Sequence, residues 1–338
     1  MVTADFHIIN VRELERGFAY YRKNCIDLID LRNQMLDEII NIKIVGGDDD
    51  EIQRLQSLRS DEDYGVLAYY PWLKQAFIIA EEEEFVFLRT ARNRNKINDS
   101  EQSLLRNKTI GIVGLSVGFS VLKGVILERS CKEVRIADFD KLSVSNLNRL
   151  PFGIKDVGVS KVQLAYRWIL EIDPFIIVKT YDMGIDSSNI QSFFNDSNGI
   201  DLVIDECDSG IVKLLLRIEA RKKRIPLLME TSDRGLLDVE DYRSIKEIFH
   251  GLIKESEIEL LLRSTNKEVL MRFVDLNNAS KRGVESFKEI GKTLDTWPQL
   301  GGDVMFGGAT ATILSRKLLL GENINSGRYY LDISERFS

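Results

Sequence analysis

The sequence predicts an α/β protein built around a doubly wound, mostly parallel sheet, with an N-terminal α+β extension. Short apolar segments rich in β-branched residues alternate with helix-length segments after Lys108, as expected for parallel strands covered on both faces. A glycine-containing turn follows the first of these strands, and an aspartate ends the second. Since 44% of the 338 residues are hydrophobic, the chain can bury a large core around such a sheet.

Five strands and four helices are expected in the first part of this sheet. The expected strands are residues 109–113, 134–137, 176–181, 202–204 and 227–229. The expected helices are residues 116–129, 160–172, 188–195 and 211–224. Two of the helices end shortly before a proline, which disfavours helical backbone at the residue before it. Because parallel strands need crossover connections, this alternation predicts a Rossmann-like sheet.

Residues 1–90 are expected to form an α+β region of unknown role. Apolar residues spaced by threes and fours predict one amphipathic helix over residues 14–39, interrupted only by Arg32. The acidic run 46–51 predicts a solvated loop rather than a metal site, because it lacks the alternating spacing of metal-binding loops. A short strand pair with a charged turn of glutamates is expected from residues 69–72, 76–80 and 85–88.

Residues 91–338 are expected to form one nucleotide-binding domain that ends in an extension of helices and a strand. In the extension, residues 242–264 predict helix, residues 269–274 a strand, and residues 307–320 a helix with small side chains. The boundary of the two predicted domains therefore lies between residues 90 and 91.

Composition excludes several classes of protein. A formal charge of −7 gives no general electrostatic reason to bind nucleic acid or an anionic membrane surface. No run reaches the roughly 18 uncharged apolar residues of a membrane span, so we expect a cytoplasmic protein. Three cysteines cannot build a four-cysteine zinc site, and two histidines argue against a histidine-based metal site or catalytic triad.

The turn after the first strand is a candidate phosphate-binding element. Gly114, Ser116 and Gly118 lead from that strand into a helix, where backbone N–H groups and the positive helix end can face phosphate. Ser116 stands where the G-x-G-x-x-G pattern has its second glycine, and Phe119 stands at the sixth position. A purely structural turn is therefore an alternative.

Asp138 ends the second strand, 20 residues after Gly118. An acid at this place can accept hydrogen bonds from the ribose hydroxyls of a nucleotide. ATP and NAD both carry an adenosine ribose, so Asp138 does not separate them. A strand-end aspartate that only stabilises a turn is the structural alternative.

Residues 138–149 read D-F-D-K-L-S-V-S-N-L-N-R. This run resembles the signature D-x-D-x-[IVL]-x-x-S-N-L-x-R of the ThiF/MoeB/HesA family, whose superfamily includes the ubiquitin-activating enzymes. Residues 205–208, D-E-C-D, resemble the family's D-C-x-D at the end of the fourth strand, and residues 92–97 resemble its arginine-rich lead-in. The resemblance covers about residues 90–240.

The resemblance implies a domain that binds ATP and Mg²⁺ and adenylates the carboxylate of a protein or peptide, such as a ubiquitin-like or sulfur-carrier protein. Carried over by position, Asp138 would hold the ribose, with the glycine turn and the side chains of Asn146, Arg149 and Lys161 at the phosphates. Asp208 would bind Mg²⁺. In many relatives an arginine of the lead-in reaches the γ-phosphate from the other subunit of a homodimer, and here it would be Arg92 or Arg94.

Elementary chemistry agrees with these roles. Attack on the α-phosphate builds negative charge on the phosphate oxygens and on the leaving pyrophosphate, so fixed cations and a metal stabilise it. The guanidinium of Arg149 can fork across two oxygens, while Lys161 acts as a movable point charge. Mg²⁺ prefers carboxylate oxygen, which Asp208 offers at the edge of the sheet where such folds bind ligands.

The chain also departs from the family pattern. No cysteine follows Cys207, so the thioester of ubiquitin-activating relatives is excluded at its usual place, and Cys207 beside acids is expected to pack rather than react. The adenylate would then pass to a nucleophile of the substrate or a partner. Asp233 and Arg234 lie where relatives bind the tail of their substrate. They could contact the substrate, or they could form an ion pair with each other. Resemblance to a bacterial side branch implies a nitroreductase-like partner.

Two other functions stay open. A non-catalytic scaffold that binds nucleotide or a partner would explain the incomplete glycine turn and the missing cysteine. An NAD-dependent oxidoreductase would also use the turn and Asp138, but it would leave Lys161 and Asp208 unexplained.

Overall fold

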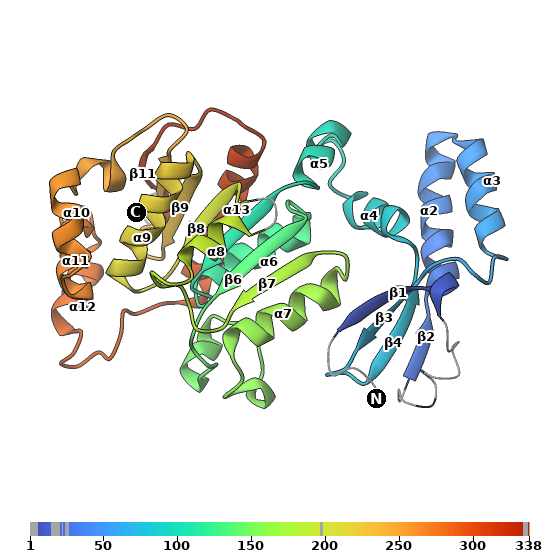
Figure 1. The fold of residues 1–338 in the computed structure, drawn as a ribbon, viewed down its shortest axis with the longest axis horizontal. Helices are drawn as coiled ribbons and strands as arrows, with labels where there is room; N and C mark the ends of the chain where they lie inside the picture. The colour runs from blue at the N-terminus through green and yellow to red at the C-terminus, as the bar shows by residue number, and fades with distance from the viewer. Residues whose placement is uncertain are drawn as a thin grey trace. The chain divides into compact units, whose positions relative to one another are not determined.

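The computed structural model describes residues 6–14, 21, 23, 27–196, 199–333 and 337 (Figure 1). The chain folds as two compact units, Met1–Asp99 and Ser100–Ser338. We call them the N-terminal unit and the C-terminal unit. None of the helices within the described ranges is long and apolar enough to cross a membrane.

A four-stranded sheet forms the centre of the N-terminal unit, in the order β1-β3-β4-β2. Its strands are β1 (His7–Asn10), β2 (Asp27–Asp30), β3 (Val66–Tyr70) and β4 (Gln75–Ile79). β3 is antiparallel to both β1 and β4, whereas β2 runs parallel to β4. The short 3-10 helix η1 (Val11–Glu13) follows β1. All five residues of β3 are buried, as expected for a central strand.

The helix predicted over residues 14–39 is wrong in its middle part. Residues 27–30 form β2, and α2 (Arg32–Gly46) begins only at Arg32, the residue that interrupted the helical spacing. Parallel pairing of β2 with β4 overrides the helical spacing of the apolar residues. Arg32, in the first turn of α2, donates hydrogen bonds from Nε and Nη2 to the carboxylate of Asp30. Most of the earlier part of that prediction, residues 15–20, 22 and 24–26, lies outside the described residues.

Two acidic runs that were predicted to be a loop and a turn instead begin helices. Asp48 accepts a hydrogen bond from the Glu51 N–H at the start of α3 (Asp49–Leu58), so the loop predicted over 46–51 is confirmed only at Gly47 and Asp48 and is wrong for residues 49–51. The glutamates predicted as a turn lead into α4 (Glu82–Thr90), which contains the predicted strand 85–88. In both helices the acids lie in the first turn, where negative charge is favourable. The strand pair itself is β3 with β4.

A seven-stranded sheet forms the centre of the C-terminal unit, in the order β11-β10-β9-β8-β5-β6-β7. The parallel strands are β5 (Thr109–Val113), β6 (Glu133–Ala137), β7 (Ile177–Tyr181), β8 (Leu202–Asp205) and β9 (Pro226–Thr231). β10 (Leu236–Asp241) and β11 (Gly327–Tyr330) add antiparallel strands at one edge. The predicted fold class and all five predicted strands are confirmed.

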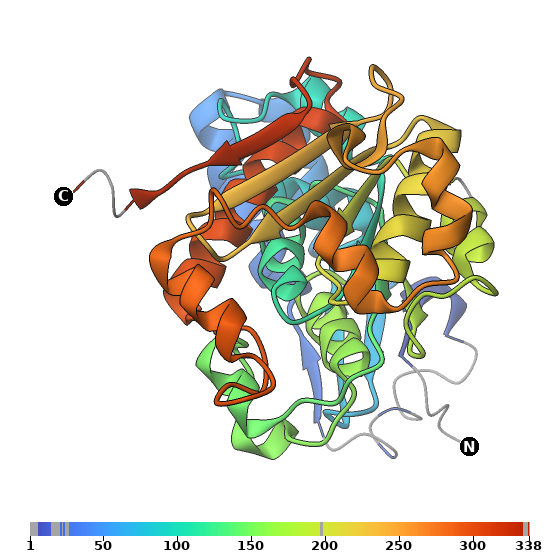
Figure 2. The same cartoon turned by 90° about the vertical axis from the view of Figure 1, so that its left-hand side faces the viewer.

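Helices cover both faces of this sheet (Figure 2). On one face α6 (Gly118–Glu128) packs against α7 (Lys161–Ile172) and α13 (Gly301–Leu319). On the other face α9 (Gly210–Lys223) packs against α8 (Ile190–Asn195) and α11 (Asn266–Phe273). Successive residues of β5 point to opposite faces of the sheet, since Gly111 faces α8 and Ile112 faces α6. The sheet is therefore doubly wound.

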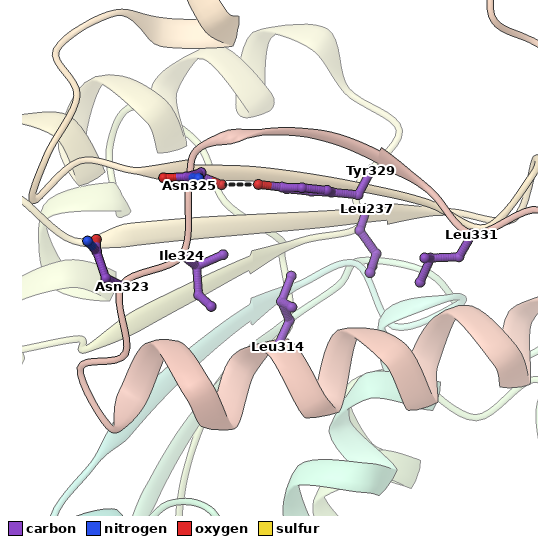
Figure 3. A pocket seen from close by; sticks show the side chains of 7 residues that line it. All are labelled: Leu237, Leu314, Asn323, Ile324, Asn325, Tyr329 and Leu331. Atoms are coloured by element: carbon purple, nitrogen blue, oxygen red, sulfur yellow. Dashed lines mark hydrogen bonds between the residues drawn. The ribbon is translucent and has the colours of Figure 1, made fainter.

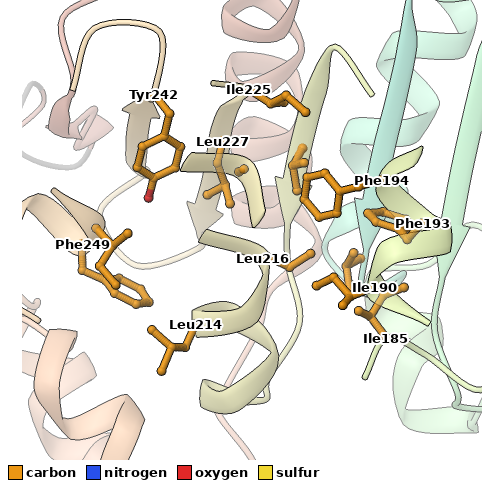
Figure 4. Close-up of a cluster of buried hydrophobic side chains, with 14 of the residues drawn as sticks. Ile185, Ile190, Phe193, Phe194, Leu214, Leu216, Ile225, Leu227, Tyr242 and Phe249 are labelled. Atoms are coloured by element: carbon orange, nitrogen blue, oxygen red, sulfur yellow. The ribbon is translucent and has the colours of Figure 1, made fainter. Parts of the chain in front are cut away.

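The core on the α8–α9 side is large and apolar (Figure 4). Phe193 and Phe194 of α8 lie edge to face, and both are fully buried. Leu214 and Leu216 of α9 and Tyr242 join the same cluster. Close packing of this kind fixes β8 and β9, whose ends carry residues of the candidate site.

The C-terminal extension differs most from its prediction. Residues 269–273 belong to helix α11 and not to a strand, because Thr265 and Glu268 form a capping box that starts the helix, and Val274 follows as its C-cap. Within 242–264 only η4 (Ile248–Gly251) and α10 (Glu255–Leu261) are helical. β10, β11 and α12 (Lys281–Glu289) were not predicted. The predicted helix 307–320 is confirmed as part of α13.

Candidate functional site

The predicted site residues of the C-terminal unit gather where the strand order reverses. β5 pairs with β6 on one side and with β8 on the other, while the connecting helices α6 and α9 cover opposite faces. The carboxyl ends of strands at such a point are where open α/β sheets bind ligands. The turn after β5, the loop after β6 and the loop after β8 all start at this edge.

Close approach of the β8 loop explains the two glycines of the turn. Gly114 has φ +91°, and a Cβ there would lie 2.4 Å from the Glu206 carbonyl oxygen. A Cβ at Gly118 would lie 3.3 Å from the Glu206 side chain. Phe119, at the sixth position of the glycine pattern, is buried against Phe152 and Trp168 of the same unit. The incomplete pattern therefore reflects packing of α6.

Asp138 ties the glycine turn to the loop after β6. One carboxylate oxygen accepts the Leu115 N–H at 2.6 Å, and the other accepts the Asp140 N–H at 2.8 Å. Burial raises the pKa of Asp138, although the nearby charge of Lys161 and the two N–H donors oppose this shift. Each oxygen keeps a second lone pair that could accept a ribose hydroxyl.

Arg149 reaches back to the glycine turn. Its Nε donates to Ser116 Oγ at 2.9 Å, and its Nη1 donates to Asn148 Oδ1 at 2.8 Å. Burial lowers the pKa of Arg149, and the charge of Asp208 opposes this effect, so the two side chains lie within electrostatic reach. Two residues that are far apart in the sequence are thus brought together, in the pattern expected of a phosphate site.

Asn146 stabilises the backbone that leads to Arg149. Its Oδ1 accepts the Ser143 N–H at 3.1 Å, which caps the short 3-10 helix η2 (Val144–Asn148). The side chain is buried, and its amide nitrogen can still donate. Asn146 can therefore serve both the loop and a ligand.

Lys161 is the first residue of α7 and is 5% exposed. Its Nζ forms an ion pair with Asp140 Oδ2 at 2.8 Å. The sequence did not indicate this partner. A phosphate at this site would have to share or replace the Asp140 carboxylate.

Asp208 offers an exposed carboxylate just past the end of β8. Among the described residues, no group of three or more His, Cys, Asp or Glu side chains could hold a metal ion. Mg²⁺ nevertheless often takes one or two carboxylates together with waters and substrate phosphates. One exposed aspartate beside a phosphate site fits that pattern.

Asp205 and Cys207, which precede Asp208, have structural roles. Asp205 is fully buried and accepts from Arg217 Nη1 at 2.6 Å and from Lys213 Nζ at 3.1 Å. Burial and Asp205 raise the pKa of Cys207 well above its ordinary value, so its thiol stays protonated at neutral pH. This agrees with the expected packing role.

The remaining predicted residues are Arg92, Arg94, Asp233 and Arg234. Arg92 and Arg94 belong to the N-terminal unit, so the roles implied for them stay predictions. The alternative in which Asp233 and Arg234 pair with each other is wrong. Asp233 accepts from Ser280, and Arg234 forms an ion pair with Asp332 at 2.9 Å.

Two acids at the same sheet edge, Glu206, which is partly exposed, and Glu230, which is buried, were not singled out from the sequence. Glu206 follows β8, and its Oε1 accepts the backbone N–H of Glu230 in β9 at 2.8 Å. Burial raises the pKa of Glu206 well above its ordinary value and that of Glu230 to about 8. The sequence feature that could have identified these two residues is the presence of an acid at the end of each of two neighbouring strands.

A separate cavity of about 340 Å³ lies between α13 and the antiparallel edge strands (Figure 3). Its lining is mostly apolar and includes Leu237, Leu314 and Leu331. The Tyr329 hydroxyl donates to the Asn325 carbonyl oxygen at its rim. None of the predicted site residues lines it, so it is not the candidate nucleotide site.

Comparison with known proteins extends these observations. An uncharacterized protein of Mycobacterium tuberculosis (strain CDC 1551 / Oshkosh) is 39% identical over 272 residues, covering 79% of this chain and 38% of that protein. Ubiquitin-like modifier-activating enzyme 5 of Drosophila persimilis is 28% identical over 149 residues, covering 41% of this chain and 39% of that enzyme. This chain thus spans less than two fifths of the length of either relative.

The fold also matches a solved structure. The tRNA N6-threonylcarbamoyladenosine dehydratase of E. coli, in complex with ATP, aligns with a TM-score of 0.51 at 17% identity, over 70% of this chain and 95% of that chain. The family comparison matches residues 90–233 to the ThiF family, which confirms the resemblance seen in the motifs. Residues 90–233 of this chain therefore belong to the ThiF family.

Proposed function

We propose that the C-terminal unit binds ATP with Mg²⁺ and adenylates a carboxylate. The observation that carries this proposal is the position of Arg149, which is held on Ser116 of the glycine turn within electrostatic reach of Asp208. Membership of the ThiF family supports it. So does the ATP complex of the E. coli dehydratase with the same fold.

The proposed reaction forms one bond and breaks one. An oxygen of the substrate carboxylate attacks the α-phosphorus of ATP, the bond from that phosphorus to the bridging oxygen breaks, and pyrophosphate leaves with the electron pair. Arg149 and Lys161 stabilise the charge on the phosphate oxygens, and Asn146 donates its amide N–H groups. Asp138 orients the ribose.

Mg²⁺, bound by Asp208, would supply positive charge to the phosphates. The site fits this ion because Asp208 is exposed at the sheet edge, and its carboxylate is a hard oxygen ligand. Arg92 or Arg94 of a second subunit would complete the phosphate site in a homodimer. A protein or peptide terminus is the proposed carboxylate, and a nitroreductase-like protein is a proposed partner.

Isotope exchange between pyrophosphate and ATP tests the proposal. Purified protein is incubated with ATP, Mg²⁺, labelled pyrophosphate and a library of peptides with free C-terminal carboxylates. We expect label to enter ATP only with particular peptides, because exchange requires a reversible adenylate. Failure to bind ATP with Mg²⁺ at millimolar concentrations would overturn the proposal.

One observation favours a second candidate, a nucleotide-binding scaffold without catalysis. Lys161 is already neutralised by Asp140, which is the arrangement of a resting structural ion pair. Both functions predict that calorimetry detects ATP binding, and pyrophosphate exchange separates them. A scaffold supports no exchange with any carboxylate, and Arg149→Ala leaves its other activities unchanged.

A further inference from the structure

Glu230 is a buried carboxylate that lacks a hydrogen-bonding partner. It lies in β9, its residue is 3% exposed, and neither of its carboxylate oxygens accepts a hydrogen bond within the described ranges. An ionised carboxylate buried in this way is costly unless a cation or a proton compensates it. The side chain is therefore incomplete as the chain alone presents it.

Glycine makes the room that Glu230 occupies. A Cβ at Gly307 of α13 would lie 1.8 Å from Glu230 Oε1, so the carboxylate rests directly on the backbone of that helix. On the other side, Glu206 holds the backbone N–H of Glu230 and packs against Gly118 at the start of α6. The position of the carboxylate is thus fixed by two strands and two helices.

Three acids lie near one another here at different depths below the surface. Asp303 of α13 is exposed, Glu206 is partly exposed, and Glu230 is buried. Asp303 is near enough for its charge to raise the pKa of Glu230. Above its pKa of about 8 Glu230 is ionised, and the negative charge of these acids then attracts a cation toward it.

No cation of the chain is bound to these acids in the described residues. Lys213 is close enough to lower the pKa of Glu206, but its Nζ donates to Asp205 and contacts Met229 Sδ. No group of three or more potential metal ligands occurs among the residues described, so a metal at these two acids would depend on ligands from outside the chain. An ammonium group brings its own N–H donors, which carboxylate oxygens accept directly.

We propose that Glu206 and Glu230 bind the amino group of a primary amine, and that this amine accepts the acyl group of the adenylate. This inference rests on the proposed function. Glu206 contacts both Gly114 and Gly118, so the amine would lie beside the turn that faces the phosphates.

The step balances without an oxidant or a further co-reactant. The amine nitrogen attacks the carbonyl carbon of the acyl-adenylate and forms a C–N bond. The bond from that carbon to the phosphate oxygen breaks, and AMP leaves with the electron pair. The ammonium form binds first and gives one proton to the ionised carboxylate of Glu230, which frees the nitrogen lone pair for attack. After the attack the nitrogen loses its second proton to the phosphate oxygen of the leaving AMP. The products are an amide and AMP.

A binding experiment tests this inference without ATP or a carboxylate. Protein labelled with ¹³C at the glutamate carboxyl carbons is titrated with n-propylammonium chloride at pH 9, where the probe, like a lysine side chain, is mostly charged. We expect the signals of Glu206 and Glu230 to shift with saturation. Glu230→Gln should weaken the affinity at least tenfold.

Two further variants keep the test decisive. Gly307→Ala moves the Glu230 carboxylate without changing its charge and should also weaken binding. Glu219→Gln is the matched control, because Glu219 is likewise buried with an unpartnered oxygen but lies on α9. Its affinity for the probe should equal that of the wild type.

Saturation without any shift of the Glu230 signal would overturn the inference, and so would equal affinities of wild type and Gly307→Ala. Competition with Mg²⁺ gives a third outcome: if Mg²⁺ shifts these signals and n-propylammonium does not, the pair binds a metal and the inference is wrong. Because the assay contains no nucleotide, its failure is distinct from failure of pyrophosphate exchange.

Discussion

The same edge of the seven-stranded sheet has a basic side and an acidic side. On the basic side, Lys161 is paired with Asp140, and Arg149 is bonded to Ser116 near Asp208. On the acidic side, Glu206 accepts only a backbone N–H from Glu230, and the Glu230 carboxylate accepts nothing from the described residues. The cations thus have side-chain partners, whereas Glu206 has only a backbone partner and the Glu230 carboxylate has none among the described residues.

This difference separates two ways of preparing a site. Cations that are held by hydrogen bonds are oriented in advance, so a ligand must exchange one partner for another and loses little charge stabilisation. Acids that are held only by backbone and glycine packing carry a cost that a ligand or a proton removes. The basic side is therefore expected to determine the rate, and the acidic side the pH dependence.

The largest expected effect is on the basic side. Arg149→Ala should lower the rate of pyrophosphate exchange about 100- to 1,000-fold, because it removes a preorganised donor to charge that develops in the transition state. The exchange rate of Arg149→Lys should lie between those of the wild type and Arg149→Ala, since lysine keeps the positive charge but cannot donate two parallel hydrogen bonds. Exchange rates at saturating ATP measure both effects.

Arg263→Ala is the control for this prediction. Arg263 is also an arginine paired with an acid, Glu259, but its side chain is 77% exposed at the end of α10. Its loss should leave exchange within twofold of the wild type. If Arg149→Ala and Arg263→Ala behave alike, the basic side does not act as proposed.

The second effect lies on the acidic side and concerns stability. The pKa of Glu230 is about 8 in the folded chain and 4.5 ordinarily, so the folded state binds more protons between these pH values. The free energy of unfolding should therefore fall as pH rises through this window. Glu230→Gln removes the titration, and its stability relative to wild type should increase by roughly 2–4 kcal/mol from pH 5 to pH 9.

Urea unfolding of both proteins at several pH values measures this change. Glutamine and glutamate differ in packing as well as in charge, so the two free energies of unfolding also differ by an amount that does not depend on pH. Only the change with pH reports the titration. A difference that is the same at pH 5 and pH 9 would contradict the assignment.

The two sides also differ in how far the sequence predicts them. Asp138, Asn146, Arg149 and Lys161 are close together in the chain and follow a strand of β-branched residues, so motif and fold could be predicted together. The contact of Arg149 with Ser116 spans 33 positions and depends on how β5 and β6 align. Glu230 was missed because its environment is created by Gly307, which is far away in the sequence.

The N-terminal unit shows the same limit for secondary structure. Residues 27–30 have helical spacing with their neighbours, but they form β2 because β4 offers a parallel partner. The glutamates before Phe85 looked like a turn, whereas acids in a first helical turn also favour a helix start. A local sequence pattern predicts a helix or strand correctly where contacts with distant segments favour the same structure. Where they do not, long-range strand pairing determines the secondary structure.

The smallest expected effect concerns the metal on the basic side. Asp208→Asn removes the charge of a single exposed ligand, and Mg²⁺ would keep its waters and phosphate ligands. We therefore expect calorimetric affinity for ATP in the presence of Mg²⁺ to fall only about tenfold, or roughly 1.4 kcal/mol. Affinity for ATP in EDTA should be unchanged or slightly higher, because the carboxylate then only repels the phosphates. Glu259→Gln, at the exposed acid paired with Arg263, should change neither affinity. An equal loss with and without Mg²⁺ would mean that Asp208 acts through Arg149, whose guanidinium it already reaches electrostatically, and not through a metal.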